Sequence, residues 1–189
     1  GEANVSRDLR EFLRIGMRYG MQGDVLAPSF GMAETSSAFI YYDDFRLDNT
    51  ADEDRFVPIG SPSAGHAVRI TDEDGNILKK GRIGRIECRG GAVTCGYYKN
   101  EKANEESFTA DGFLITGDMG YMEGGVVTLT GREKEIIIIN GLNYYVQDIE
   151  SVVNEIDEII PSFTTAVSVA GNGGTEEILV VFSPEDDRV

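Results

Sequence analysis

The chain has 189 residues and a formal net charge of -16, and 41% of its residues are hydrophobic. It contains no run near the roughly 20 apolar residues of a membrane helix and no cluster of lysine and arginine, which excludes a membrane-spanning protein and argues against general nucleic-acid binding. A single histidine and two cysteines, Cys88 and Cys95, are too few for a zinc site, and together with the lack of a leader-like opening they favour a cytoplasmic protein.

The first 55 residues predict one helix, one short strand and an acidic loop. We expect Ser6 to cap a helix over residues 7–18. The apolar face of this helix consists of Leu9, Phe12, Leu13 and Met17. Residues 25–27 then predict a short buried strand, and the Asp- and Asn-rich residues 43–55 predict a surface loop. Residues 1–55 form the first of three predicted domains, a remnant of a larger one.

Residues 56–132 change to short strands that alternate with turns. The predicted strands cover residues 67–70, 83–89, 113–115 and 126–129. Asp74-Gly75-Asn76 predicts a hairpin turn after the first strand, and residues 101–108 predict one short helix. Strands at this spacing favour a small, twisted β-barrel or a sandwich, which we expect as the second domain.

Residues 133–189 show a third pattern, of mixed helix and strand. A buried strand is predicted at residues 136–139, and a hairpin at residues 164–170 and 178–182. Between them, a helix that should stop at Pro161 has an apolar face formed by Ile149, Val152, Val153, Ile156 and Ile160. About 55 residues are few for a stable domain, so we expect an incomplete one and a chain cut from a larger protein. The predicted fold class is α+β, mostly β.

Two segments place a carboxylate beside a glycine. In residues 30–35, Glu34 follows a strand and a glycine turn. A carboxylate in this position could bind a magnesium ion that bridges phosphates. Phe30 of the same segment could stack on a flat base. In Thr116-Gly117-Asp118, the Asp118 carboxylate can accept two hydrogen bonds from a ribose diol. Taken singly, an ordinary strand-to-loop turn and a turn aspartate are the better explanations.

Two more segments lie near the predicted domain boundary at residues 132–134. In Gly131-Arg132-Glu133-Lys134-Glu135, Arg132 could hold a phosphate or ribose oxygen, and the alternative is a solvated linker of alternating charge. Residues 140–145 form a loop that leads into a helix, and the alternative there is a helix cap with aromatic packing. Each segment is a weak signal alone.

The order and spacing of these segments resemble those of the adenylate-forming superfamily, which contains acyl-CoA synthetases, nonribosomal-peptide adenylation domains, fatty acyl-AMP ligases and luciferases. The resemblance covers residues 1 to about 183. The motifs that match, in chain order, are Gly1-Glu2-Ala3, Ser29-Phe30-Gly31-Met32-Ala33-Glu34, Gly60-Ser61-Pro62, Gly96-Tyr97-Tyr98, Asp111-Gly112-Phe113, Thr116-Gly117-Asp118, Gly131-Arg132-Glu133-Lys134-Glu135 and Asn140-Gly141. Together they are highly specific.

The resemblance implies a role for each motif. Glu34 would ligate magnesium and, with Arg132, act as a catalytic residue. Asp118 would hold the ribose hydroxyls with the help of Arg132, and Lys134 would be the hinge about which the small C-terminal domain rotates. The residues that would bind ATP or AMP are Gly1, Glu2, Phe30, Gly31, Asp118 and Arg132.

The resemblance also implies a reaction in two halves. A carboxylic acid would attack the α-phosphate of ATP to give an acyl-adenylate, and a thiol would then take the acyl group, either from coenzyme A or from the phosphopantetheine of a carrier protein. Gly141 and Asn143 are candidates for the channel through which the acceptor enters. The family's phosphate loop precedes residue 1 and its catalytic lysine follows residue 189, so we expect the chain by itself to be inactive.

Some positions point to one branch of the superfamily. Ala33 replaces a threonine and Phe30 a tyrosine of the usual motif, and residues 143–150 resemble the corresponding segment of fatty acyl-AMP ligases, which load a carrier protein. The acidic loop at residues 41–55 is shorter than the insertion of that branch. Two alternatives stay open: a conventional acyl-CoA ligase, and a non-catalytic module that only docks a partner.

Overall fold

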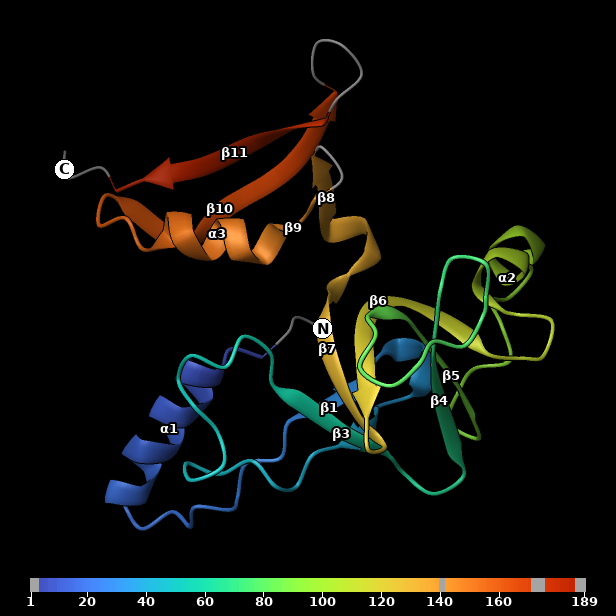
Figure 1. Cartoon of the computed structure of the whole chain (residues 1–189), viewed down its shortest axis with the longest axis horizontal. Helices are drawn as coiled ribbons and strands as arrows, with labels where there is room; N and C mark the ends of the chain where they lie inside the picture. The colour runs from blue at the N-terminus through green and yellow to red at the C-terminus, as the bar shows by residue number, and fades with distance from the viewer. Residues whose placement is uncertain (1–3, 140–141, 171–175, 186–189) are drawn as a thin grey trace. The chain divides into compact units, whose positions relative to one another are not determined.

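The structure is a computed structural model that describes residues 4–139, 142–170 and 176–185. It divides into two compact units, residues 1–130 and 131–189 (Figure 1). Strands dominate over helices in both units, which confirms the predicted α+β, mostly β, fold class. Among the described residues, every helix is too short or too polar to cross a membrane.

The first unit is built on one seven-stranded sheet whose strand order is β1-β2-β3-β7-β6-β5-β4. Five of its neighbouring pairs, β1–β2, β2–β3, β3–β7, β4–β5 and β5–β6, are antiparallel. The strands are β1 (Ser29–Gly31), β2 (Ala38–Tyr41), β3 (Pro58–Pro62), β4 (His66–Thr71), β5 (Gly84–Gly90), β6 (Leu114–Glu123) and β7 (Val126–Arg132). The sheet therefore joins strands from the first two predicted domains.

One hydrophobic core spans this sheet. The centre of β5 is buried on both faces, because Ile86, Glu87 and Cys88 are all buried, and Ile86 and Cys88 belong to this core. The core also takes buried side chains from β1, β2, β3, β4, β6 and β7: Phe30, Phe39, Ile40, Ile59, Ile70, Leu114, Val127 and Leu129. Residues far apart in the sequence thus hold the sheet together by burying apolar surface.

Helix α1 (Ser6–Arg18) begins one residue earlier than predicted, and the prediction that Ser6 caps it was wrong. Val5 is the N-cap, and the Ser6 hydroxyl instead donates a hydrogen bond of 2.6 Å to the carbonyl oxygen of Ala51. Leu13 is fully buried, but Phe12 is 54% exposed, so the predicted apolar face is only partly covered.

The acidic loop at residues 43–55 is confirmed as a loop, and α1 is tied to it by charge. Arg10 and Arg14 both pair with Asp52. The predicted strand at residues 25–27 is wrong: these residues are in a loop, and pairing begins at Ser29. Pro28 explains the shift, because a proline has no N–H to donate to a strand ladder.

Between β5 and β6 lies the short helix α2 (Glu101–Ser107), close to its predicted bounds. Its N-cap is Asn100, whose side chain accepts a hydrogen bond of 3.2 Å from the Ala103 N–H. The predicted hairpin between β4 and β5 also forms, with the Asp72 carboxylate accepting hydrogen bonds from the N–H groups of Asp74 and Asn76 in its turn. Asx turns of this kind, in which an Asp side chain accepts from the backbone two residues further on, are typical of turns.

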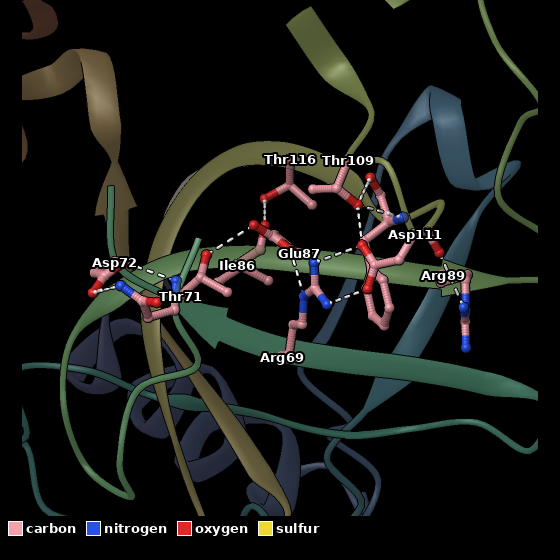
Figure 2. Close-up of polar contacts among 11 residues, drawn as sticks. Arg69, Thr71, Asp72, Ile86, Glu87, Arg89, Thr109, Asp111 and Thr116 are labelled. Carbon is pink, nitrogen blue, oxygen red and sulfur yellow. Dashed lines mark hydrogen bonds and ion pairs between the residues drawn. The ribbon is translucent and has the colours of Figure 1, made fainter. Parts of the chain in front are cut away.

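The start of β6 is fixed by an arginine held between two carboxylates (Figure 2). Arg69 of β4 donates to Glu87 of β5 at 2.6 Å and pairs with both carboxylate oxygens of Asp111, at 2.6 and 3.0 Å. Its guanidinium lies 3.9 Å from the centre of the Phe113 ring. Glu87 is buried, and the Thr71 hydroxyl donates to its other oxygen at 2.8 Å. These contacts connect β4, β5 and the segment that enters β6.

The second unit contains a strand pair, a helix and a long hairpin: β8 (Ile136–Ile139), β9 (Leu142–Tyr145), α3 (Val146–Asn154), β10 (Ile159–Ala170) and β11 (Glu176–Pro184). The predicted strand at 136–139 and the pairing of residues 164–170 with the segment around 178–182 are confirmed. Residues 171–175, which would form the hairpin turn, lie outside the described residues.

The helix predicted to run to Pro161 ends earlier, so this prediction was wrong. It stops at Asn154, Ile156 follows it at 49% exposure, and Ile160 and Pro161 belong to β10. The hairpin competes for this segment: Ile159 pairs with Pro184, and the Thr164 hydroxyl donates to the Asn154 side chain at 2.7 Å. β-Branched residues such as Ile159 and Ile160 also favour a strand.

Gly60 should be the most sensitive glycine of the sheet. Its φ is +102°, and an added Cβ would collide with the carbonyl group of Tyr41 on the neighbouring strand, whereas Gly65, with φ +85°, has open space around it. We expect Gly65→Ala to lower the free energy of unfolding by about 1 to 2 kcal/mol, the cost of positive φ alone, and Gly60→Ala by more than about 3 kcal/mol. Urea denaturation measures both. Equal losses would contradict the steric argument.

The Arg69–Asp111 pair should make stability depend on pH in the acid range. The hydrogen bonds from Arg69, and second that from Thr109, lower the pKa of Asp111 to about 2. An unperturbed aspartate titrates near pH ~3.9, so the pair adds stability above that pH and loses it as the pH falls through about 2. Unfolding free energies between about pH 5 and 2 should fall less steeply in Asp111→Asn than in the wild type. Parallel curves would rule the linkage out.

Candidate functional site

Asp118 lies on a bulge of β6 and not in a turn. Arg85 of β5 pairs with Met119 of β6, and Glu87 pairs with Ile115. Between these two pairs β5 has one residue and β6 has three, so β6 carries two extra residues at this place. The three residues Thr116-Gly117-Asp118 lie opposite the single residue Ile86, and Gly117 has φ +76°, which few residues but glycine adopt. Bulges of this kind redirect side chains next to functional sites.

Hydrogen bonds hold the bulge in place, and Figure 2 shows the one between Thr116 and Ile86. The Thr116 hydroxyl donates to the carbonyl oxygen of Ile86 at 2.8 Å and accepts from the N–H of Asp118 at 3.1 Å. Asp118 is only 2% exposed. Burial, with the charge of Asp118 as a second cause, raises the pKa of the Cys88 thiol to about 12. Cys88 is therefore a neutral core residue, and the local negative charge belongs to Asp118.

Glu34 lies on a tight turn between β1 and β2. The turn is a short helical segment, η1 (Ala33–Thr35), and the Thr35 hydroxyl closes it by accepting from the N–H of Met32 at 2.9 Å. Gly31 is needed where the chain enters, because a Cβ there would collide with the backbone of Ser37 and Ala38. Thr35 is buried and Glu34 is half-buried. The turn thus fixes the backbone of Glu34 beside the sheet.

Tyr97 is a partner of Glu34 that the sequence analysis did not identify. Its hydroxyl donates to the Glu34 carboxylate at 2.9 Å, and the N–H of Thr94 donates to the Glu34 carbonyl oxygen at 2.7 Å. The hydrogen bond with Glu34 is the first cause that raises the pKa of Tyr97, so its hydroxyl stays protonated near neutral pH. The signal that could have found it is its place in the matching motif Gly96-Tyr97-Tyr98.

Phe30 lies in the sheet with its ring in the core. It is 5% exposed, and its ring packs edge-on against Phe39 with 6.1 Å between ring centres. Phe30 and Glu34 are brought together by β1 and its turn, while Asp118 is on β6 of the same sheet. Stacking of Phe30 on adenine stays a prediction.

The remaining predicted site residues belong to the second unit or lie outside the described residues. Arg132 ends β7 and is exposed, and Lys134 is exposed in the short helical turn η2 (Glu133–Glu135). Asn143 lies on β9, where its backbone pairs with Ile138. The predicted residues outside the described part of the chain are Gly1, Glu2 and Gly141.

The described residues offer single carboxylates and no ready-made metal cage. Within residues 4–139, 142–170 and 176–185, no three His, Cys, Asp or Glu side chains come together. A lone half-buried carboxylate such as Glu34 fits magnesium, which proteins usually hold through one or two carboxylates while nucleotide phosphates and water complete its shell.

Comparisons with known proteins agree with these motifs. The chain matches the family of AMP-binding enzymes over residues 1–98. It is 38% identical over 186 residues to nonribosomal peptide synthetase apvA of Aspergillus terreus, and 35% identical over 190 residues to microperfuranone synthase of Emericella nidulans. Both alignments cover 97% of this chain and 20% of the relative. The chain thus spans about a fifth of the length of these curated relatives.

Solved structures match over the whole fold. The structure of McyG A-PCP complexed with phenylalanyl-adenylate has a TM-score of 0.89 and 36% identity, covering 99% of this chain and 34% of that one. Fatty acyl-adenylate ligases from E. coli and L. pneumophila match with a TM-score of 0.82 and 25% identity, covering 100% of this chain and 37% of that one. With the family match over residues 1–98, these findings confirm the predicted resemblance: the chain belongs to the AMP-binding enzymes of the adenylate-forming superfamily.

Proposed function

We propose that this chain is the part of an ATP-dependent, AMP-forming ligase that holds the ribose and the metal and carries the hinge. The parent enzyme activates a carboxylic acid as an acyl-adenylate and passes the acyl group to a thiol. The observation that carries the proposal is the built setting of two carboxylates on one sheet: Asp118 on the β6 bulge and Glu34 on the closed turn after β1. A degenerate docking module would have no chemical reason to keep either setting.

The relatives support this chemistry. One similar structure holds phenylalanyl-adenylate, another is described as bound to keto acyl adenylate, and a third, MatB from Rhodopseudomonas palustris, as bound to ATP. In the first half-reaction an oxygen of the substrate carboxylate bonds to the α-phosphorus of ATP while the bond to pyrophosphate breaks. Positioning and charge neutralisation do most of the work in such a displacement.

Each predicted site residue has a part in that step. Glu34 would hold magnesium, which neutralises phosphate charge when bound. Asp118 accepts hydrogen bonds from the ribose hydroxyls, and Arg132 donates to the ribose or the phosphate. Phe30 and the glycine turn at Gly31 border the adenine. Gly1 and Glu2 lie against the same base, by the resemblance of their segment to the family motif.

The second half-reaction needs a different arrangement of the two units. The thiol sulfur bonds to the acyl carbon, loses its proton and displaces AMP. We propose that rotation at Lys134 exchanges the two arrangements, and that the acceptor thiol enters past Gly141 and Asn143. The curated relatives include several nonribosomal peptide synthetases, and this favours a carrier-protein phosphopantetheine over free coenzyme A as acceptor.

The proposal is tested by exchange of labelled pyrophosphate into ATP, using the full-length protein and a panel of carboxylic acids. The panel holds phenylalanine, keto acids and fatty acids, the kinds of acid named for the similar structures. We expect exchange with at least one class and faster loading of a carrier protein than of free coenzyme A. A folded protein that binds no ATP and exchanges with no acid would support the docking module instead.

Replacing Asp118 should weaken ATP binding strongly. Two hydrogen bonds to a charged acceptor contribute about 1.5 to 3 kcal/mol each, so Asp118→Ala should cost on the order of a hundredfold or more in ATP affinity, measured by calorimetry. Asp118→Asn keeps the shape of the buried side chain and controls for folding. Glu123→Gln is the matched control, because Glu123 is an exposed carboxylate at the end of the same strand, paired only at the surface with Lys80. Unchanged ATP affinity in both Asp118 variants would show that Asp118 does not bind the ribose hydroxyls.

Locking the hinge should separate the two half-reactions. Proline fixes φ near −65°, so Lys134→Pro should trap one orientation of the second unit. If that orientation is the adenylating one, adenylation survives within roughly tenfold and thiol transfer falls on the order of a hundredfold or more. Single-turnover pyrophosphate release and carrier loading measure the two steps, and Lys134→Ala controls for the lost charge. Equal losses in a folded Lys134→Pro variant would show that the pivot lies elsewhere.

A further inference from the structure

The loop between β5 and α2 is fastened to the Glu34 turn at three points. The N–H of Thr94 donates to the Glu34 carbonyl oxygen at 2.7 Å, and the Ser36 hydroxyl donates to the carbonyl oxygen of Ala92 at 3.3 Å. The third contact is the one that reaches the carboxylate, from the Tyr97 hydroxyl to Oε1 of Glu34 at 2.9 Å. Two segments joined by contacts that span 56 to 63 residues thus form one structural unit around Glu34.

Tyr97 is itself held rigidly, by the side chain of Asn104 on α2. The Asn104 amide accepts from the N–H of Tyr97 at 2.6 Å and donates to the carbonyl oxygen of Tyr97 at 3.1 Å, so it pairs with that backbone as a neighbouring strand would. Gly96, with φ +139°, permits the approach, since a Cβ there would lie 2.9 Å from the Asn104 amide oxygen. The backbone that carries the Tyr97 side chain is therefore held by α2 before any ligand binds.

We propose that Tyr97 is a positioning residue for Glu34: its hydroxyl fixes Oε1 of the carboxylate and leaves Oε2 to a magnesium ion that binds with ATP. The proposal rests on the proposed role of Glu34 as the metal ligand. Its physical basis is preorganisation, because a carboxylate held by a second donor loses less freedom when the metal binds. The exposed neighbour Tyr98 has no such place in the site: it is 87% exposed, with Lys99 over its ring.

The test is a binding measurement on the full-length protein. Calorimetry gives the ATP affinity in EDTA and in saturating Mg²⁺, and the ratio of the two is the factor by which the metal tightens ATP binding. Tyr97→Phe keeps the ring and removes only the hydroxyl. It should lower this factor roughly three- to tenfold, while ATP affinity in EDTA stays within about twofold of the wild type. Asn104→Ala should lower the same factor by a smaller amount, and Tyr98→Phe, the matched control, should leave it unchanged.

A double-mutant cycle with Glu34→Gln separates positioning from a general structural effect. If Tyr97 acts through the Glu34 carboxylate, Tyr97→Phe has no further effect on the factor in the Glu34→Gln background. An equal effect in both backgrounds, or a loss of ATP affinity in EDTA as large as that in Mg²⁺, overturns the positioning role.

The remaining outcomes tell the two proposals apart. If Glu34→Gln lowers the factor and Tyr97→Phe does not, the role of Tyr97 is refuted and the metal assignment stands. If Glu34→Gln itself leaves the factor unchanged, the metal assignment under the proposed function fails, and the role of Tyr97 fails with it. Melting temperatures of all variants confirm that each comparison is made between folded proteins.

Discussion

The hydrogen bond from the Thr116 hydroxyl to the carbonyl oxygen of Ile86 is the contact on which the site depends. It ties the bulge of β6 to β5 at the place where β6 has two residues more than β5. Without the bulge, Gly117 and not Met119 would lie opposite Arg85, and Asp118 would not be fixed where it is. The network around Arg69 supports the same region by joining the segment before β6 to β4 and β5.

Local patterns predicted most strands of this fold, because alternation and glycine turns are properties of a few adjacent residues. The strands at 67–70, 83–89 and 136–139 and the paired segments of the final hairpin were found in this way. Two of the failures share one cause. The Ser6 hydroxyl bonds to Ala51, in a loop 45 residues away, and so does not cap the helix. The end of α3 is decided by the hairpin that follows it. Neither of these competing interactions is visible in the local sequence.

The candidate site was found only in part, for a related reason. Glu34 and Asp118 belong to short motifs whose order along the chain identified the family, so their residues could be named from the sequence. Arg69 lies outside these motifs, and its partner Asp111 lies 42 residues away. Tyr97 lies within a matching motif, but its contact with Glu34, 63 residues away, cannot be seen in that motif. Folding brings such supporting residues to a site, and a sequence motif does not show these contacts between distant parts of the chain.

The continuity of β7 limits how the two units can move. The boundary between them falls after Thr130, yet β7 runs on to Arg132, and β8 begins at Ile136. Only the three residues of η2 separate one strand from the next, which leaves six soft backbone dihedrals between them. A connection this short has few degrees of freedom, unlike a long flexible linker. The reorientation proposed for the second unit would then be a rotation between a small number of backbone states, with little chain entropy to lose in either.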